Sequence, residues 1–172
     1  VDSQGQASAA VTAYRKLTAT DNVSAVITWG SGVALALAPL VNRDKIVQMG
    51  VATSSEDYST PSDFNFRNYP KASQEAAYLA ELASGSLKLS EIAIVHTEND
   101  YGTSTAEMFK KAFLQRGGKV LVTSQLQPGE SDNRTQVLVV RKARPQAIFL
   151  AAYPIEGGAF LKQARQKHLP LS

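Results

Sequence analysis

Residues 23–42, VSAVITWGSGVALALAPLVN, contain the pattern that decides the fold. Residues 23–29 form a short apolar run rich in β-branched side chains, which is typical of a buried strand. After Gly30, residues 31–42 are rich in alanine and leucine and predict a helix. A strand that passes through a short glycine-serine turn into a helix is the unit from which α/β proteins are built.

The same alternation of short apolar runs with longer amphipathic runs continues along the chain. Further strands are predicted at residues 46–49, 65–67, 91–96, 119–125 and 146–151. Further helices are predicted at residues 6–18, 72–84, 103–116, 132–143 and 155–167, with Asp132 as the cap of the fourth. This order predicts an α/β protein whose parallel sheets carry helices on both faces.

The most loop-like stretch between the two runs of alternation is ASGSLKLS at residues 83–90. We expect a boundary there, with residues 1–87 in a first lobe and residues 88–172 in a second, because two small α/β lobes fit the pattern better than one sheet. Residues 1–3 resemble the tail of a strand and residues 169–171 the start of another. We therefore expect the chain to be a fragment of a longer one.

Composition excludes several classes of function. The chain has 172 residues, 44% of them hydrophobic, which is enough for a buried core. Its 18 basic and 15 acidic residues give a net charge of +3 that is scattered, whereas nucleic-acid binders usually carry a basic stripe, so we expect no nucleic-acid partner. The absence of cysteine excludes thiolate catalysis, disulfides and zinc–thiolate sites. No apolar run approaches the roughly twenty residues that span a bilayer.

Catalytic, metal and cofactor motifs are also missing. No strand is followed by a G-x-G-x-x-G turn or a P-loop, and the G-x-S-x-G elbow of serine hydrolases is absent. His96, Glu98 and Asp100 alternate, which raises the possibility of a metal site. Successive residues in such a run point in different directions, however, and the only other histidine is His168. We expect no catalytic residues, no metal and no cofactor.

Loops at the carboxyl ends of parallel strands are where ligands bind in open α/β sheets. Trp29, Gly30 and Ser31 form the first such loop, which opens directly into a helix and can offer backbone N–H groups and a hydroxyl to a carboxylate. The alternative is that Ser31 only caps the helix. The second loop, GVATS at residues 50–54, can bind the same anion or can be an ordinary serine/threonine turn.

Two tyrosines occupy equivalent places in later strand–helix units. Tyr101 lies in TENDYG at residues 97–102, and Tyr153 lies in AYPIEG at residues 152–157. A tyrosine combines an apolar wall with a polar tip, which suits a small amphipathic ligand. Either ring can instead simply cover a loop.

Four stretches of this sequence resemble one protein family: residues 26–54 (VITWGSGVALALAPLVNRDKIVQMGVATS), 64–83 (FNFRNYPKASQEAAYLAELA), 92–121 (IAIVHTENDYGTSTAEMFKKAFLQRGGKVL) and 145–166 (PQAIFLAAYPIEGGAFLKQARQ). They are similar, in order, to extracytoplasmic solute-binding proteins of the branched-chain amino-acid (Leu/Ile/Val) type, which supply ABC transporters. The resemblance covers essentially the whole chain. It implies a type I periplasmic-binding fold of two Rossmann-like (flavodoxin-like) lobes, incomplete in this chain.

The resemblance also implies roles for particular residues. Ser31, Thr53 and the backbone of Ala52 match positions that hold a ligand carboxylate, and Tyr101 and Tyr153 match positions that close over the ligand from the second lobe.

Two departures lie in the wall of the first lobe. Trp29 and Gly30 replace the family's usual Gly-Pro, and residues 50–51 replace a longer run. Trp29 is therefore also a candidate ligand contact. The acidic residue that usually receives a ligand ammonium falls beyond Ser172. The resemblance thus leaves an amino acid and a plain carboxylate both open.

By the same resemblance, we expect a non-enzymatic protein, periplasmic or extracellular, that binds a small solute by closure of its lobes and delivers it to the permease of an ABC transporter. The alternative is a ligand-sensing receptor domain of the same fold that is coupled to a signalling partner. Sheet edges and part of the core should be exposed in these residues alone. We therefore expect association with the remaining chain segments or with another copy.

Overall fold

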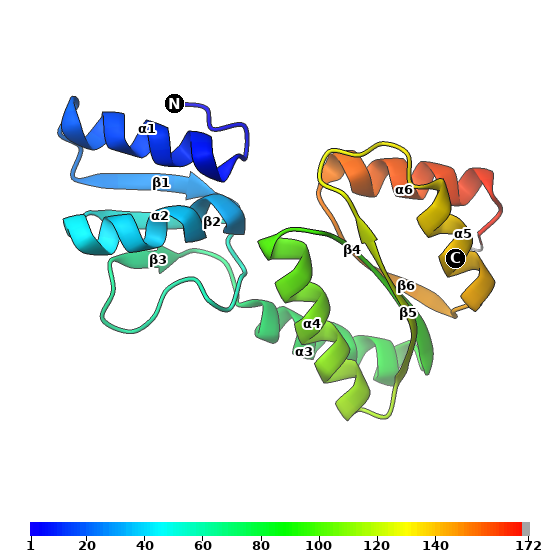
Figure 1. Ribbon diagram of the computed structural model, residues 1–172. Helices are drawn as coiled ribbons and strands as arrows, with labels where there is room; N and C mark the ends of the chain where they lie inside the picture. The colour runs from blue at the N-terminus through cyan, green and yellow to red at the C-terminus, as the bar shows by residue number, and fades with distance from the viewer. Residues whose placement is uncertain (170–172) are drawn as a thin grey trace. The chain divides into compact units, whose positions relative to one another are not determined.

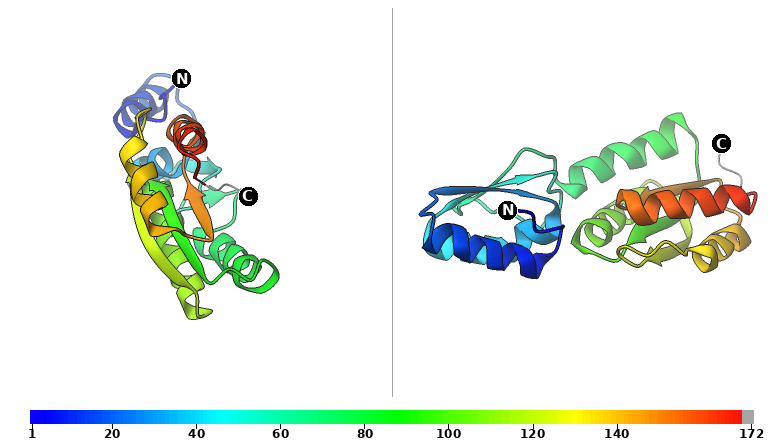
Figure 2. Two further views of the ribbon diagram at one scale, coloured as in Figure 1. Left: turned by 90° about the vertical axis from the view of Figure 1, so that its right-hand side faces the viewer. Right: turned by 90° about the horizontal axis from the view of Figure 1, so that it is seen from above.

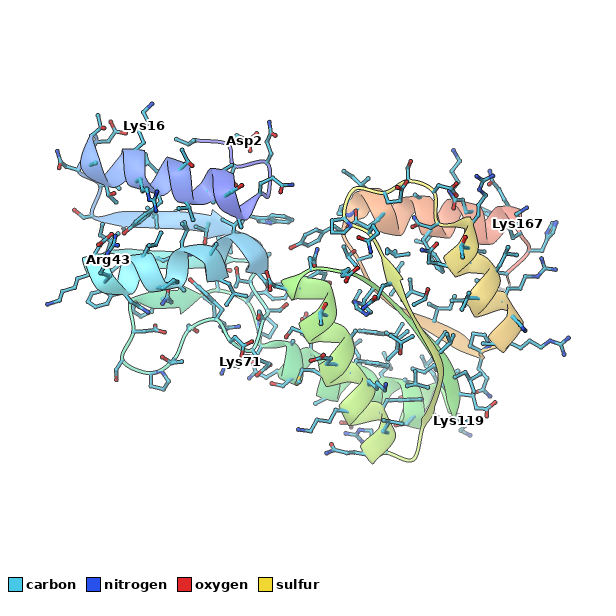
Figure 3. All side chains as sticks on the ribbon, viewed as in Figure 1. Asp2, Lys16, Arg43, Lys71, Lys119 and Lys167 are labelled. Carbon is cyan, nitrogen blue, oxygen red and sulfur yellow. The ribbon has the colours of Figure 1, made fainter. Side chains whose placement is uncertain are left out.

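The computed structural model describes residues 1–169. They divide into two compact units, the first Val1–Lys71 and the second beginning at Ala72 (Figure 1). Lys71, labelled in Figure 3, is the last residue of the first unit. The first unit contains α1 (Ala7–Ala19), β1 (Ala25–Trp29), α2 (Ser31–Asp44), β2 (Val47–Val51) and β3 (Asn65–Arg67). The second contains α3 (Ala72–Glu81), a π-helical turn (Leu82–Ser86), β4 (Glu91–Thr97), α4 (Asp100–Gln115), β5 (Lys119–Leu126), α5 (Arg134–Ala143), β6 (Ala147–Ala151) and α6 (Pro154–Gln166).

The sheet of the first unit has three parallel strands in the order β1-β2-β3. Its core contains Val26 of β1 together with Tyr14 of α1 and Leu37 of α2. Both helices therefore cover the same face, as the right-hand view of Figure 2 shows. In α2 the buried residues Val33, Leu37 and Val41 recur at the four-residue spacing of one helical face.

The opposite face of this sheet is bare, which corrects the expectation of helices on both faces. Strand alternation places Ile27 and Trp29 on that face, and the register sets Ile27 beside Met49 and Met49 beside Phe66. Ile27 is 79% exposed, Trp29 54% and Phe66 50%. Among the described residues, no helix covers this apolar surface.

The sheet of the second unit, in the order β5-β4-β6, is also parallel, and helices cover both of its faces (Figure 1). Ile92 and Ile94 of β4 pack into a core with α3 and α4. Ala93 and Val95, which point the other way, pack with α5 and α6. The central strand is apolar without alternation because both of its faces are buried.

Helix α3 packs with the second unit, since Ala76 and Ala80 share a core with Ile92, Phe109 and Phe113. The division into compact units therefore falls between Lys71 and Ala72, whereas the sequence predicted a lobe boundary between 87 and 88. The assignment of residues 1–87 and 88–172 to two functional lobes remains a prediction.

Three smaller differences concern element ends. Helix α4 begins at Asp100 rather than at 103, because Asn99 caps it through an Oδ1 atom that accepts a hydrogen bond from the Gly102 N–H at 2.8 Å. Helix α5 begins after Asn133, while the expected cap, Asp132, binds the Arg134 guanidinium at 2.6 Å. Residues 1–3 form no strand, and of the strand expected at 169–171 only Leu169 lies within the described residues. Across residues 1–169, no helix is long and apolar enough to cross a membrane.

Candidate functional site

The carboxyl ends of β1 and β2 meet at one edge of the first sheet, and their loops are joined by hydrogen bonds. The Gly30 N–H donates to the Val51 carbonyl at 3.0 Å. The Ser55 N–H donates to the Ser31 hydroxyl at 3.2 Å. Ser31 is fully buried. The two loops predicted to bind an anion therefore form a single cluster.

Ser31 is not the cap of α2, so that alternative is wrong. The N-cap is Gly30, whose φ of 83° lies in the region that favours glycine, and Ser31 is the first residue of the helix. Because its oxygen accepts from Ser55, the Ser31 hydroxyl keeps its own proton for donation. It lies at the positive end of the α2 dipole, where an anion is stabilised.

Thr53 is also fully buried, and its hydroxyl donates to the Val51 carbonyl at 3.3 Å. Gly50 leaves no room for a side chain, since a Cβ atom there would lie 2.7 Å from the Tyr58 ring and 2.9 Å from Thr53 Oγ1. Ala52 has a φ of 50°, a left-handed conformation that costs an alanine about 1–2 kcal/mol. The surrounding contacts hold the loop in this strained form.

Arg67 of β3 joins the same cluster, although the residue-by-residue reading of the sequence did not single it out. Its Nη1 atom donates to the carbonyls of Thr53 and Ser55, at 3.2 Å and 3.1 Å. Its guanidinium carbon lies 5.3 Å from the centre of the Tyr58 ring, within cation–π distance. Burial lowers the pKa of Arg67, and the charge of nearby Glu56 partly offsets this. The only signal in the sequence for Arg67 was its place beside Phe66 in residues 64–83, one of the segments that carry the family resemblance.

Trp29 differs from the other candidates of the first unit. Its side chain is 54% exposed and shares the bare face of the sheet with Ile27, whereas its neighbour Thr28 is buried on the helix side. The structure therefore brings Ser31, Ala52 and Thr53 together, while the Trp29 side chain lies on the bare face of the sheet. Its contact with a ligand stays a prediction.

In the second unit, the two predicted tyrosines meet. Tyr101 lies in the first turn of α4 and Tyr153 is the N-cap of α6. Their rings stack with centroids 5.2 Å apart and planes 1° from parallel. Burial is the main cause that raises both pKa values, that of Tyr153 to about 12, so both hydroxyls stay protonated at neutral pH.

A buried hydrogen-bond chain holds these tyrosines in place. The Thr97 hydroxyl donates to the Glu156 carboxylate at 2.9 Å, and the Tyr153 N–H approaches Thr97 Oγ1 at 3.4 Å. A Cβ on Gly102 would lie 2.1 Å from the Thr97 carbonyl, so only glycine lets α4 start against the end of β4. The sequence-based list of candidates missed Thr97 and Glu156, because nothing in their local pattern marks them.

His96, the centre of the metal alternative, is buried, and its Nδ1 atom lies 3.0 Å from the Thr97 carbonyl. Glu98 is exposed and pairs with Gln127 instead. No group of three histidine, cysteine, aspartate or glutamate residues in positions 1–169 could hold a metal ion.

Comparison of the sequence with known families gives a match of almost full length. The profile of the family described as "Periplasmic binding protein" matches residues 1–171. The chain belongs to the periplasmic binding protein family. The resemblance recognised in the sequence, and with it the α/β fold with parallel sheets, is confirmed. Members of this family are binding proteins rather than enzymes.

Three known proteins are similar to this periplasmic binding protein. A leucine-, isoleucine-, valine-, threonine- and alanine-binding protein of Pseudomonas aeruginosa is 28% identical over 118 residues. A leucine-binding protein of Thermotoga maritima superposes with a TM-score of 0.88 at 24% identity. A solute-binding protein of an ABC transporter from Rhodopseudomonas palustris, solved with 3,4-dihydroxybenzoic acid, has a TM-score of 0.88 at 20% identity. The two solved structures establish the fold.

In each comparison the matched segment is a larger share of this periplasmic binding protein than of its relative. The match to the Pseudomonas protein covers 69% of this chain and 32% of that protein. The two solved structures match 96% and 98% of this chain but 48% and 47% of their own. The chain therefore spans about half the length of these structures and about a third of the curated relative.

Proposed function

We propose that this protein binds a small carboxylate-bearing solute outside the cytoplasm, in the periplasm or extracellularly, and delivers it to the permease of an ABC transporter. The observation that carries the proposal is the buried cluster at the carboxyl ends of β1 and β2. Ser31 and Thr53 are fully buried polar residues in joined loops at the start of a helix. Such an arrangement suits an anion far better than an apolar ligand.

In this proposal the Ser31 hydroxyl and the backbone at Ala52 bind the solute's carboxylate. The Thr53 hydroxyl joins them by turning away from the Val51 carbonyl, to which it otherwise donates. Hydrogen bonds to a charged group contribute about 1.5–3 kcal/mol each, so a few of them account for micromolar affinity. The α2 dipole adds to the attraction, because the positive helix end lies at Ser31.

The stacked pair of Tyr101 and Tyr153 contacts the rest of the solute and forms the second half of the clamp. Solute binding then draws the two lobes together, as a shift in population toward the closed state. The Pseudomonas relative binds leucine, isoleucine, valine, threonine and alanine, and the Rhodopseudomonas protein was solved in complex with an aromatic acid. Both classes carry a carboxylate, and flat aromatic side chains such as Tyr101, Tyr153 and Trp29 favour the aromatic class.

A thermal-shift screen of the full-length protein tests the proposal. The ligands are leucine, alanine, 3,4-dihydroxybenzoate and acetate. The matched amides of the first and third, in which a neutral carboxamide replaces the carboxylate, serve as controls. An acid present at one hundred times its dissociation constant stabilises the folded state by about 2.7 kcal/mol. The proposal fails if no acid in the panel raises the melting temperature.

Two variants tie any binding to the cluster. Ser31→Ala and Thr53→Val should each weaken binding of the acid by about 10- to 100-fold, since each removes a donor to a charged group. Ser8→Ala, at an exposed serine of α1 in the same unit, is the control and should leave affinity unchanged. If calorimetric titration gave the same affinity for the acid in all three variants, the binding site would not be this cluster.

A further inference from the structure

Arg67 connects the third strand of the first sheet to the loop that follows the second. Besides its two bonds to the carbonyls of Thr53 and Ser55, its Nε atom donates to the Ser59 hydroxyl at 3.2 Å. The guanidinium also lies over the ring of Tyr58. One cation thus contacts three residues of a single loop and an aromatic ring, which is more than a surface arginine needs for solvation.

The Tyr58 ring, which lies against the Arg67 guanidinium, is itself firmly held. The residue is fully buried, and its hydroxyl donates to the carbonyls of Gln48 and Phe66 at 3.4 Å and 3.2 Å. Strands β2 and β3 thus fix the tyrosine hydroxyl, and the buried ring keeps its position beside the guanidinium.

The contacts of Arg67 determine which way the loop's amides point. In a trans peptide the carbonyl and the following N–H lie on opposite sides, and no cis peptide occurs in the described residues. Holding the Thr53 carbonyl therefore turns the Ser54 N–H away from Arg67, and the Ser55 N–H is already bound to Ser31. Arg67 thus orients the donor groups beside the two hydroxyls of the proposed carboxylate site.

Two buried donors in this region have no hydrogen-bond partner within the described residues. They are the Ser54 hydroxyl, on a residue with no exposed surface, and the Nη2 atom of Arg67. A buried donor without a partner costs about 1–3 kcal/mol, so proteins seldom keep two in one region without a use for them.

We propose that Arg67 is the positioning and charge-selective residue of this loop, which makes the site prefer a carboxylate over an uncharged analogue of the same shape. This inference rests on the proposed function. Arg67 orients the amides and hydroxyls of residues 52–55 toward the carboxylate. Its positive charge, which the nearby carboxylates of Glu56 and Asp63 offset only in part, attracts an acid more strongly than a neutral amide.

The test compares acid and neutral amide in the full-length protein, with 3,4-dihydroxybenzoate against 3,4-dihydroxybenzamide. Arg67→Gln should weaken binding of the acid by about 10- to 100-fold and of the amide by only a few-fold. Arg67→Lys, which keeps the charge, should recover part of the acid's affinity. Arg15→Gln removes the same charge from an exposed site of α1 and should change neither affinity.

The outcomes separate the two proposals. If the wild-type protein binds no acid, the proposed function fails before any variant is made, and this inference fails with it. If the wild type binds an acid but Arg67→Gln loses acid and amide equally, or loses neither, the inference alone is overturned. Should Arg67→Gln fail to fold, Ser54→Ala and Arg67→Lys replace it. Hydrogen exchange of residues 52–59 must then accelerate in Arg67→Lys, and acid affinity must fall in both variants.

Discussion

At the scale of single residues, the polar groups of this protein are unusual in how deeply they lie. Ser31, Thr53, Thr97 and Glu156 are all at most 2% exposed, and each hydrogen-bonds to another loop or element or to its own backbone neighbours. Buried polar groups of this kind specify one arrangement, because any other leaves them unpaired. The candidate sites of both units are built on such bonds.

Buried tyrosines make stability sensitive to alkaline pH. Burial is the first cause that raises the pKa of Tyr58 and of Tyr153 from 10 to about 12. A group whose pKa is raised on folding stabilises the protein fully below its unfolded pKa and loses that contribution as pH rises through the folded one. The free energy of unfolding should therefore fall between pH 10 and 12, as measured by urea unfolding.

Tyr58→Phe supplies the control for this pH dependence. Without the buried phenol, the decline of the free energy of unfolding between pH 10 and 12 should be shallower than in the wild-type protein. A spectroscopic titration in which every tyrosine ionises at its ordinary pKa of 10 would contradict the expectation.

At the scale of elements, the start of α4 depends on a single glycine. Asn99 caps the helix, and Gly102 lets its first turn lie directly against the last residue of β4. That contact sets the position of Tyr101 beside Tyr153. The stacked pair is thus a consequence of how one helix meets one strand.

Gly102→Ala should push α4 away from β4 and lower the free energy of unfolding by about 1–3 kcal/mol, the usual cost of overpacking. Gly158→Ala in α6 is the matched control, because a Cβ there meets nothing within 4 Å. In a helix interior this change should stabilise by about 0.5–1 kcal/mol. The free energy of unfolding of both variants is measured with urea. Equal changes in the two would show that the close approach of Gly102 to the Thr97 carbonyl is unimportant.

At the scale of the whole molecule, the two sheets differ in how they are covered. Helices lie on both faces of the second sheet, whereas the first sheet leaves Ile27, Trp29, Val47 and Phe66 exposed on one face. A parallel sheet is ordinarily buried on both faces, and a contiguous apolar patch usually marks an interface. We expect a further protein segment or another copy of the chain to cover this face.

The purified chain of 172 residues should accordingly self-associate as its concentration rises and should bind a hydrophobic dye. Replacing Ile27 and Phe66 together by lysine should reduce both effects in sedimentation velocity and dye fluorescence. Leu161→Lys, at an exposed leucine of α6, should change neither. A monodisperse wild-type monomer with a cooperative melting transition would rule this expectation out.

Local patterns in the sequence were sufficient for the order and type of the elements. Alternating apolar periodicity and glycine or proline punctuation are short-range signals, so the strands and helices were predicted with ends displaced by only a few residues. Asp132 was the wrong cap: the helix begins after Asn133, and the Asp132 carboxylate accepts hydrogen bonds from the backbone N–H and the guanidinium of Arg134. The parallel α/β class and the choice of loops at strand ends followed from the same signals.

Long-range contacts required the tertiary structure. The sequence by itself determined that Ser31, Ala52, Thr53 and the two tyrosines lie in loops or first turns at the ends of parallel strands, because strand polarity dictates this. Only the tertiary structure decided that Arg67 reaches those loops, that α3 packs with the second unit, and that both helices of the first unit share one face. The reason is physical: these outcomes depend on packing between segments far apart in the chain, which no local periodicity encodes.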